Sequence, residues 1–386
     1  MNSGHMKTTL TTLIATGATL VGTTVSAAPF LAIGDSAELF LTGTVGIRFD
    51  DNVTLSAEKS DDVVLEVAPG FSFEFGKNAQ TSGSFAYYET ISRYSDNSSL
   101  DSELSTVRFN SNYSNGKTSV TANASFAQLN QNTPDTVIAG RAALSRRDVT
   151  NLGATGEFEI SEKSSVSVGA KYEGTSYKRN TFVDSDIVTV PVKYFFEVSP
   201  KVDASVGVQY RDTNLTSLSG APASRDSQDF FYSVGARGDF TAKLNGTLDI
   251  GVNNRDIDGG DSKTSLGLQS TLNYLYSEKT TFNVAFANDY GNSGQGEGQE
   301  NTTFSFGVNT QFVPEFGMNA KVSYRKIGYF SRADDDYYEY TVGGSYSLNE
   351  YVSFNGDLTY RDNESGLGAS GDFDNTVFSL AVRVRY

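Results

Sequence analysis

Apolar and polar residues alternate along most of this chain. Between positions 202 and 211 the apolar side chains occupy every second place, at Val202, Ala204, Val206, Val208 and Tyr210. Polar or small residues fill the places between them, and segments 318–325 and 352–361 repeat the pattern. Successive side chains of an extended strand point to opposite faces, so the pattern predicts strands with one apolar and one polar face.

Short turn signals interrupt this alternation roughly every 37 residues. They lie at Asn78, Asn115-Gly116, Glu162, Pro200, Ala242, Glu278, Pro314 and Asn349. Each interval holds two strands and one longer loop, so eight turns divide the chain into nine hairpins and 18 antiparallel strands. A count of 16 stays open, because segments 84–94 and 120–126 alternate less cleanly.

Three features of the pattern indicate a membrane barrel instead of a soluble sandwich. The apolar phase recurs on nearly every strand, and short turns alternate with long loops, as in outer-membrane barrels. Aromatic residues also recur at two heights, as girdles at the membrane interfaces would. The outer girdle is predicted at Tyr172, Tyr210, Tyr324 and Tyr360, and the inner one at Phe158, Phe240, Phe282, Phe316 and Tyr351. Lipid leaves no backbone group unpaired, so we expect an all-β, transmembrane, antiparallel up-and-down barrel.

Both ends of the chain carry export signals. Lys7 precedes an apolar stretch from Leu10 to Val25, and Val25-Ser26-Ala27 matches a small-residue cleavage site. We therefore expect residues 1–27 to be a signal peptide, with 1–5 an upstream extension, and residues 28–386 to be a single barrel domain. The last strand alternates Phe378, Leu380, Val382, Val384 and Tyr386 with polar or small residues. This end resembles the signal read by the barrel assembly machinery, which implies the outer membrane of a Gram-negative-type bacterium.

Composition removes most enzyme chemistry. The chain has no Cys, and its one histidine, His5, lies upstream of the predicted signal peptide. Ser-His hydrolysis, a Cys nucleophile and His-based metal sites are thereby excluded, so we expect no enzyme, no cofactor and no metal site. The formal net charge of −16 disfavours nucleic acid as a partner. Outer-membrane lipid and lipopolysaccharide are the expected surroundings.

The polar phase predicts the residues that line the lumen. The candidates are Arg48, Arg108, Lys193, Arg211, Arg237, Arg255, Lys321, Arg325, Arg361, Glu66, Glu74, Asp249 and Asp357. A Tyr-Arg pair repeats at Tyr210-Arg211, Tyr324-Arg325 and Tyr360-Arg361, with Arg255 slightly higher. These arginines are expected either to form a cationic ring that engages an anionic solute or to pair with nearby acids and stiffen the wall.

The loop from about 130 to 147 is the longest irregular interval of the repeat. It holds Arg141, Arg146 and Arg147 in an Ala-rich context. One hypothesis is that it folds inward and narrows the pore with those arginines, as the loop in this position does in general porins. The other is that it extends the flanking strands at the surface.

The segment from Gly46 to Asp101 carries a family resemblance. It contains Asp51-Asn52-Val53, Ser60-Asp61-Asp62, Ala68-Pro69-Gly70-Phe71, and Tyr87-Tyr88 through Tyr94-Ser95-Asp96. These elements resemble the β-barrel porins found with exopolysaccharide operons. The resemblance implies an exit channel for a secreted polysaccharide, working with a periplasmic or inner-membrane export apparatus.

Three functions follow as hypotheses. The first is a polysaccharide-export channel, because a lumen of Tyr, Asn, Gln, Ser and paired charges suits a hydrated glycan. The alternative is a diffusion porin for small anionic or sugar solutes, narrowed by the 130–147 loop. A third is a structural or adhesive surface barrel that functions through its acidic loops. The transported solute, its direction and the oligomeric state stay undetermined by the sequence.

Overall fold

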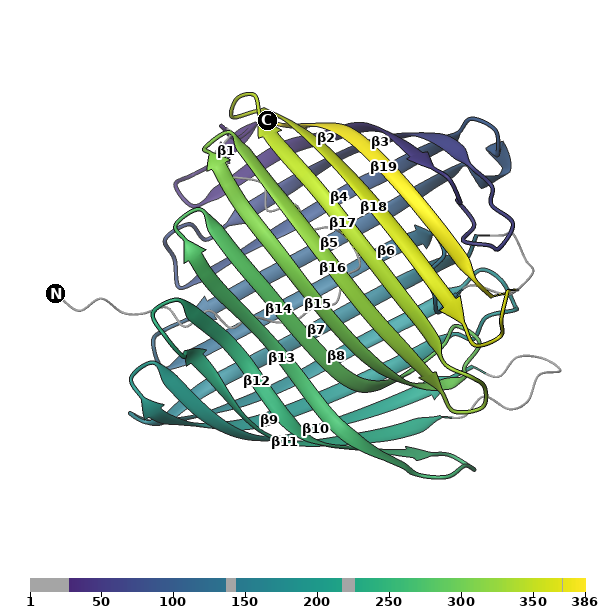
Figure 1. The fold of residues 1–386 in the computed structure, drawn as a ribbon. Helices are drawn as coiled ribbons and strands as arrows, with labels where there is room; N and C mark the ends of the chain where they lie inside the picture. The colour runs from purple at the N-terminus through teal and green to yellow at the C-terminus, as the bar shows by residue number, and fades with distance from the viewer. Residues whose placement is uncertain (1–27, 137–143, 217–225, 370) are drawn as a thin grey trace.

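The computed structural model describes residues 28–136, 144–216, 226–369 and 371–386; the predicted signal peptide lies outside them. Nineteen strands form one sheet, in which the short β1 (Leu31–Ile33) only pairs with β2. The other eighteen pair antiparallel with their neighbours in sequence, and β19 pairs back onto β2. The predicted 18-stranded closed barrel is confirmed, and Figure 1 shows its strands wrapping around a common interior.

The strands of the wall share a length of 13 to 16 residues. They are β2 (Ala37–Asp50), β3 (Asp62–Phe75), β4 (Thr81–Tyr94), β5 (Ser102–Ser114), β6 (Thr118–Asn130), β7 (Arg146–Ser161), β8 (Ser164–Tyr177), β9 (Ser185–Ser199), β10 (Val202–Leu215), β11 (Ser227–Asp239), β12 (Leu244–Ile257), β13 (Lys263–Ser277), β14 (Thr280–Asn292), β15 (Gly298–Val313), β16 (Phe316–Tyr329), β17 (Asp335–Ser347), β18 (Val352–Ser365) and β19 (Phe373–Arg385). Within these described ranges, one 3-10 turn, η1 (Ser98–Leu100), follows β4. No helix within the described residues is long and apolar enough to cross a membrane.

All eight predicted turn positions lie in short connections at one end of the barrel. The turn at Asn115-Gly116 shows why: Gly116 has φ +89°, a left-handed conformation that glycine adopts without steric cost. The start of β2 and the C-terminal residue also meet at this end, because Leu41 N donates to Tyr386 O (2.6 Å) and Tyr386 N to Leu41 O (2.9 Å). The longer loops all lie at the opposite end, called here the mouth.

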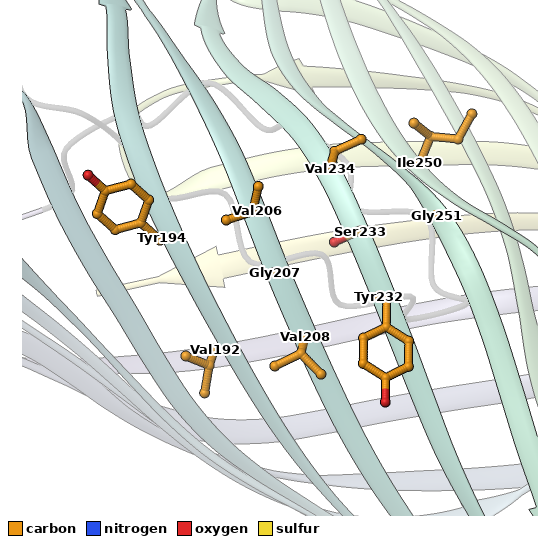
Figure 2. Close-up of a pocket in the computed structure, with 10 residues that line it drawn as sticks. All are labelled: Val192, Tyr194, Val206, Gly207, Val208, Tyr232, Ser233, Val234, Ile250 and Gly251. Atoms are coloured by element: carbon orange, nitrogen blue, oxygen red, sulfur yellow. The ribbon is translucent and has the colours of Figure 1, made fainter.

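The outer face of the wall is apolar. Figure 2 shows a shallow hollow on it, around which side chains of β9 to β12 stand. Val206, Tyr232 and Val234 are more than half exposed there, whereas Ser233, between the last two, is buried on the opposite face. Aromatic pairs lie on the same outer face, such as Tyr324–Tyr338 at 5.1 Å and Phe282–Phe306 at 5.9 Å between ring centroids. Lipid solvates this face, so the apolar residues need no protein core.

One seam of the barrel is incomplete. The register between β13 and β14 ends at Leu268 opposite Asn288, although β13 begins at Lys263 and β14 continues to Asn292. Above that point β14 still pairs with β15 on its other side, through Asn292 opposite Gly298. The mouth end of β14 therefore has one backbone edge that its neighbouring strand does not satisfy.

Candidate functional site

Loops from four hairpins join across the mouth. We define the mouth cluster as the described residues of the β2–β3 loop (51–61), the β6–β7 loop (131–136, 144–145), the β8–β9 loop (178–184) and the β14–β15 loop (293–297). Asn132 Nδ2 donates to Thr54 O at 2.6 Å. Gly294 N donates to Asp135 O, and Val183 N to Gly294 O, both at 2.8 Å. Each loop is therefore fixed to another loop instead of extending into solvent.

Apolar side chains form a small core within the mouth cluster. Val53, Leu55, Leu144, Phe182 and Val183 are each at most 7% exposed. Phe182 also stacks on Tyr177, at the end of β8, with 4.8 Å between ring centroids. Burial of several apolar side chains offsets part of the entropy lost when loops become ordered, so the cluster has a packing reason to stay together.

Asp135 anchors the β6–β7 loop to the far wall. Arg325 on β16 donates to both carboxylate oxygens of Asp135, at 2.7 and 2.8 Å, and Gln299 adds a third bond at 3.0 Å. In the ring of strands, β16 stands nine places from β7, which is half of eighteen. The loop therefore links strands that stand on opposite sides of the ring.

The surroundings of Asp135 keep it ionised. Burial alone would raise its pKa, but the charge of Arg325 and the hydrogen bonds from Arg325 and Gln299 lower the pKa below its usual value. The carboxylate form is therefore the one that holds the loop across the mouth at neutral pH.

The predicted constriction arginines have different places. Arg141 lies outside the described residues. Arg146 is exposed at the start of β7, opposite Asn130. Arg147 is 7% exposed and donates to Gln131 O at 2.8 Å and to Ser145 Oγ at 3.1 Å. Arg147 thus closes the stem of its own loop, and a role of these arginines in selectivity stays a prediction.

Most of the predicted lumen cations are paired with acids. Every candidate for the cationic ring donates to a carboxylate. The pairs are Arg211 with Asp229 and Asp289, Arg255 with Asp229, Arg325 with Asp135, and Arg361 with Glu339. Arg48 pairs with Asp50 and Glu66, Lys193 with Asp249, Arg237 with Glu157 and Asp203, and Glu74 with Arg385. This pattern favours the interpretation in which the arginines stiffen the wall.

Three predicted lumen residues have no ion pair among the described residues. The Arg108 guanidinium lies 5.7 Å from the centroid of the Tyr88 ring and contacts no carboxylate. Lys321 on β16 is exposed on the same face as Arg325. Asp357 lies opposite Ser379 in the β18–β19 ladder. Within the predicted set, these are the charges that the wall leaves available to a solute.

The acids that hold the cations were harder to find from the sequence. The sequence pattern does not mark Asp135, which anchors the loop, or Asp289 as a partner of a lumen arginine. Their partners lie 190 and 78 residues away. The alternating phase places Asp229 and Asp289 on the inner face, but no local spacing marks them as partners of Arg211. The described residues hold no cluster of His, Cys, Asp and Glu that suits a metal ion.

A closed membrane barrel with a polar interior and a bridged mouth defines an outer-membrane channel. The chain belongs to the family described as "Putative beta-barrel porin 2", whose profile matches residues 29–386. It is therefore a porin of the outer membrane and not an enzyme. A comparison with curated proteins gives no match.

Among solved structures the chain is similar to other barrels at low identity. OpdL of Pseudomonas aeruginosa is 12% identical, with a TM-score of 0.47, over 92% of this chain and 99% of that one. OpdO of Pseudomonas aeruginosa is 10% identical, with a TM-score of 0.49, over 91% and 97%. OccAB3 of Acinetobacter baumannii is 10% identical, with a TM-score of 0.46, over 92% and 100%.

Proposed function

We propose that this porin is a diffusion channel for small hydrophilic solutes, sugars or small anions. The observation that carries the proposal is the Asp135–Arg325 ion pair, which ties a loop across the mouth. Eighteen strands that lie ~4.8 Å apart and are tilted by ~40° would form a round barrel about 36 Å in diameter, measured between opposite backbones. A bridging loop divides that opening, so the passage suits small molecules better than a wide polymer.

Export of a secreted polysaccharide is the competing function. A glycan chain would have to displace a loop that is fixed at both walls and packed on a small apolar core. The resemblance over Gly46 to Asp101 supports export, but the mouth geometry favours diffusion. A structural or adhesive barrel is the third candidate, and it would need no passage at all.

Reconstitution separates these three functions. The purified barrel in planar bilayers should give stable single-channel conductance, and liposome swelling should be fast for monosaccharides and fall steeply for longer oligosaccharides. Equal swelling rates for long oligosaccharides would contradict a small-solute passage, and a complete lack of conductance would leave the structural role. Deleting the gene and measuring secreted polysaccharide tests export directly, because diffusion predicts unchanged secretion.

A further inference from the structure

In one part of the barrel, inward side chains of non-adjacent strands contact each other across the lumen. On β10 to β12, eight inward side chains are at most 8% exposed: Asp203, Ser205, Asp229, Phe231, Ser233, Asp249, Asn253 and Arg255. On β5 and β16 the inward Arg108 and Lys321 are exposed. Inward residues are buried elsewhere in the ring too, for example Thr106, Ile327 and Asn375, so contacts between non-adjacent strands are what mark one side of the lumen as filled by its own side chains.

Ion pairs that skip over strands fill that side. Arg237 on β11 donates to both carboxylate oxygens of Glu157 on β7, at 2.8 and 2.5 Å, across four places in the ring. Its guanidinium also lies 3.4 Å from the ring centroid of Phe195 on β9. In a round ring, strands four places apart would lie about 23 Å from each other. Two side chains cannot span that distance, so the wall bends sharply here.

Two further contacts extend this bend toward the mouth. Lys193 on β9 pairs with Asp249 on β12 at 2.7 Å. Arg211 on β10 donates to both oxygens of Asp289 on β14, at 2.8 and 3.0 Å. We call the inner face of β7 to β14 that these pairs hold together the closed corner. Figure 1 shows β9 to β11 at the lower edge of the barrel, where the front and rear walls meet.

The unpaired edge of β14 seals the mouth end of the closed corner. Asn253 Nδ2 donates to Asn288 O at 3.0 Å. Arg211 Nη2 donates to Tyr290 O at 2.9 Å, and Arg255 Nη1 to Gly291 O at 2.7 Å. Side chains of β10 and β12 thus replace the ladder bonds that β13 does not supply, and they draw the end of β14 against the opposite wall.

We infer that solutes cross the barrel along one side only, the inner face of β2 to β6 and β15 to β19, which we call the open face. On it, Arg108 and Lys321 are two exposed cations without an ion pair among the described residues, and they meet an anionic group of the solute. This inference rests on the proposed diffusion function and adds the route and the residues that determine specificity.

The positions of the two cations fit this role. Strands β5 and β16 stand seven places apart in the ring through β2, so they lie on nearly opposite sides of the lumen. Both residues lie about seven positions from the short turn that begins or ends their strand. They therefore face the passage at a similar depth, and the Tyr88 ring holds Arg108 against its wall.

The chain contains no cysteine, which makes single-cysteine labelling a clean test. Ser125→Cys lies beside Arg108 in the ladder, and Ser323→Cys is two residues from Lys321 on the same face. The matched control variants in the closed corner are Ser205→Cys and Ser233→Cys. They also replace serine by cysteine, but at side chains that are only 7% and 8% exposed. A charged thiosulfonate reagent added to open channels should reduce the current of the first two variants and leave the last two unchanged.

Controls distinguish the possible failures. Labelling after denaturation verifies the thiol of each variant, and heat-modifiability in SDS verifies its folding. A current block at Ser205→Cys or Ser233→Cys, or none at both open-face positions, would overturn the inference while the wild-type conductance upholds the proposed function. A wild type without conductance would instead remove the proposed function itself.

The second test concerns charge. Replacing Arg108 and Lys321 by Gln should lower the anion-to-cation permeability ratio, read from the reversal potential in a KCl gradient, by about threefold per charge. Lys279→Gln, in the short turn before β14, is the matched control and should change nothing. An unchanged ratio in the double variant would show that the solute does not meet these residues.

Discussion

Asp135→Asn is the sharpest perturbation of the bridged mouth. The substitution preserves shape and leaves an amide oxygen to accept from Gln299, but it removes the negative charge that pairs with Arg325. The two charge-assisted bonds, at 2.7 and 2.8 Å, lose their ionic character. The loop then has a weaker connection to the far wall, while the apolar core of the mouth cluster stays intact.

The burial of the pair sets the size of the effect. Breaking a buried pair by removing one partner costs ~3–5 kcal/mol, whereas an exposed pair contributes ~0.2–1 kcal/mol. The side chains of Arg325 and Asp135 are 23% and 26% exposed, so the cost lies between these limits. We expect about 2 kcal/mol, which corresponds to about a 30-fold larger population of the undocked loop.

Single-channel recording in planar bilayers measures this population. Asp135→Asn should give more frequent transitions to a higher-conductance level, since an undocked loop no longer divides the mouth. Asp334→Asn is a matched control, because Asp334 also pairs with a cation of β16, Lys326, but in an exposed pair. The reasoning is refuted if Asp135→Asn and Asp334→Asn give the same record as the wild type.

Three further predictions concern the Asp135–Arg325 pair and two contacts of the closed corner. Acid should have the same effect as Asp135→Asn. The pKa of Asp135 in the docked loop lies below the ordinary 3.8, so its stabilisation of the docked loop is complete above pH 3.8 and is lost as the pH falls through the docked pKa. In that acid range the frequency of transitions to the higher-conductance level should rise in the wild type and stay constant in Asp135→Asn. Arg237→Gln should lower the free energy of urea unfolding in detergent by ~3 kcal/mol, since Glu157 loses the guanidinium that donates to both of its carboxylate oxygens. Glu157→Gln in the same background should recover part of this loss, and no recovery would disprove the pairing. Asn253→Leu should lower the free energy of urea unfolding by ~1–3 kcal/mol, because the backbone oxygen of Asn288 loses its hydrogen-bond donor. An unchanged midpoint of the urea transition would mean that water replaces this donor.

The barrel could be predicted because its signals are local. A turn such as Asn115-Gly116 is specified by residues that accept its backbone geometry, and alternation fixes which face of each strand meets lipid. The less regular segment around Val120 still forms β6, because a strand between two paired neighbours is held by its ladder whatever its own pattern. Segments 84–94 and 120–126 both form paired strands despite their weaker alternation, and the barrel has eighteen strands.

The site was predictable only in part, since phase gives the face of a residue and not its partner. Alternation placed Arg211 and Arg237 on the inner face, but their partners depend on how the ring bends. A round barrel and a folded one share the same strand order and the same local pattern. The ion pair between β11 and β7 exists only because the wall folds at β9 and β10, and no spacing along the chain encodes that bend.

The closed corner shows why abundant charge in a lumen is poor evidence for a cationic ring. A barrel that folds on itself must fill the inner angle, and its inward positions are mostly polar. Burying an ion pair costs desolvation, which only close partners and extra hydrogen bonds repay. Arg211 meets that condition with Asp229, Asp289 and Tyr290 O. The charged side chains with the most partners thus hold the wall together. A solute contacts the charged side chains that have no carboxylate partner among the described residues, such as Arg108 and Lys321.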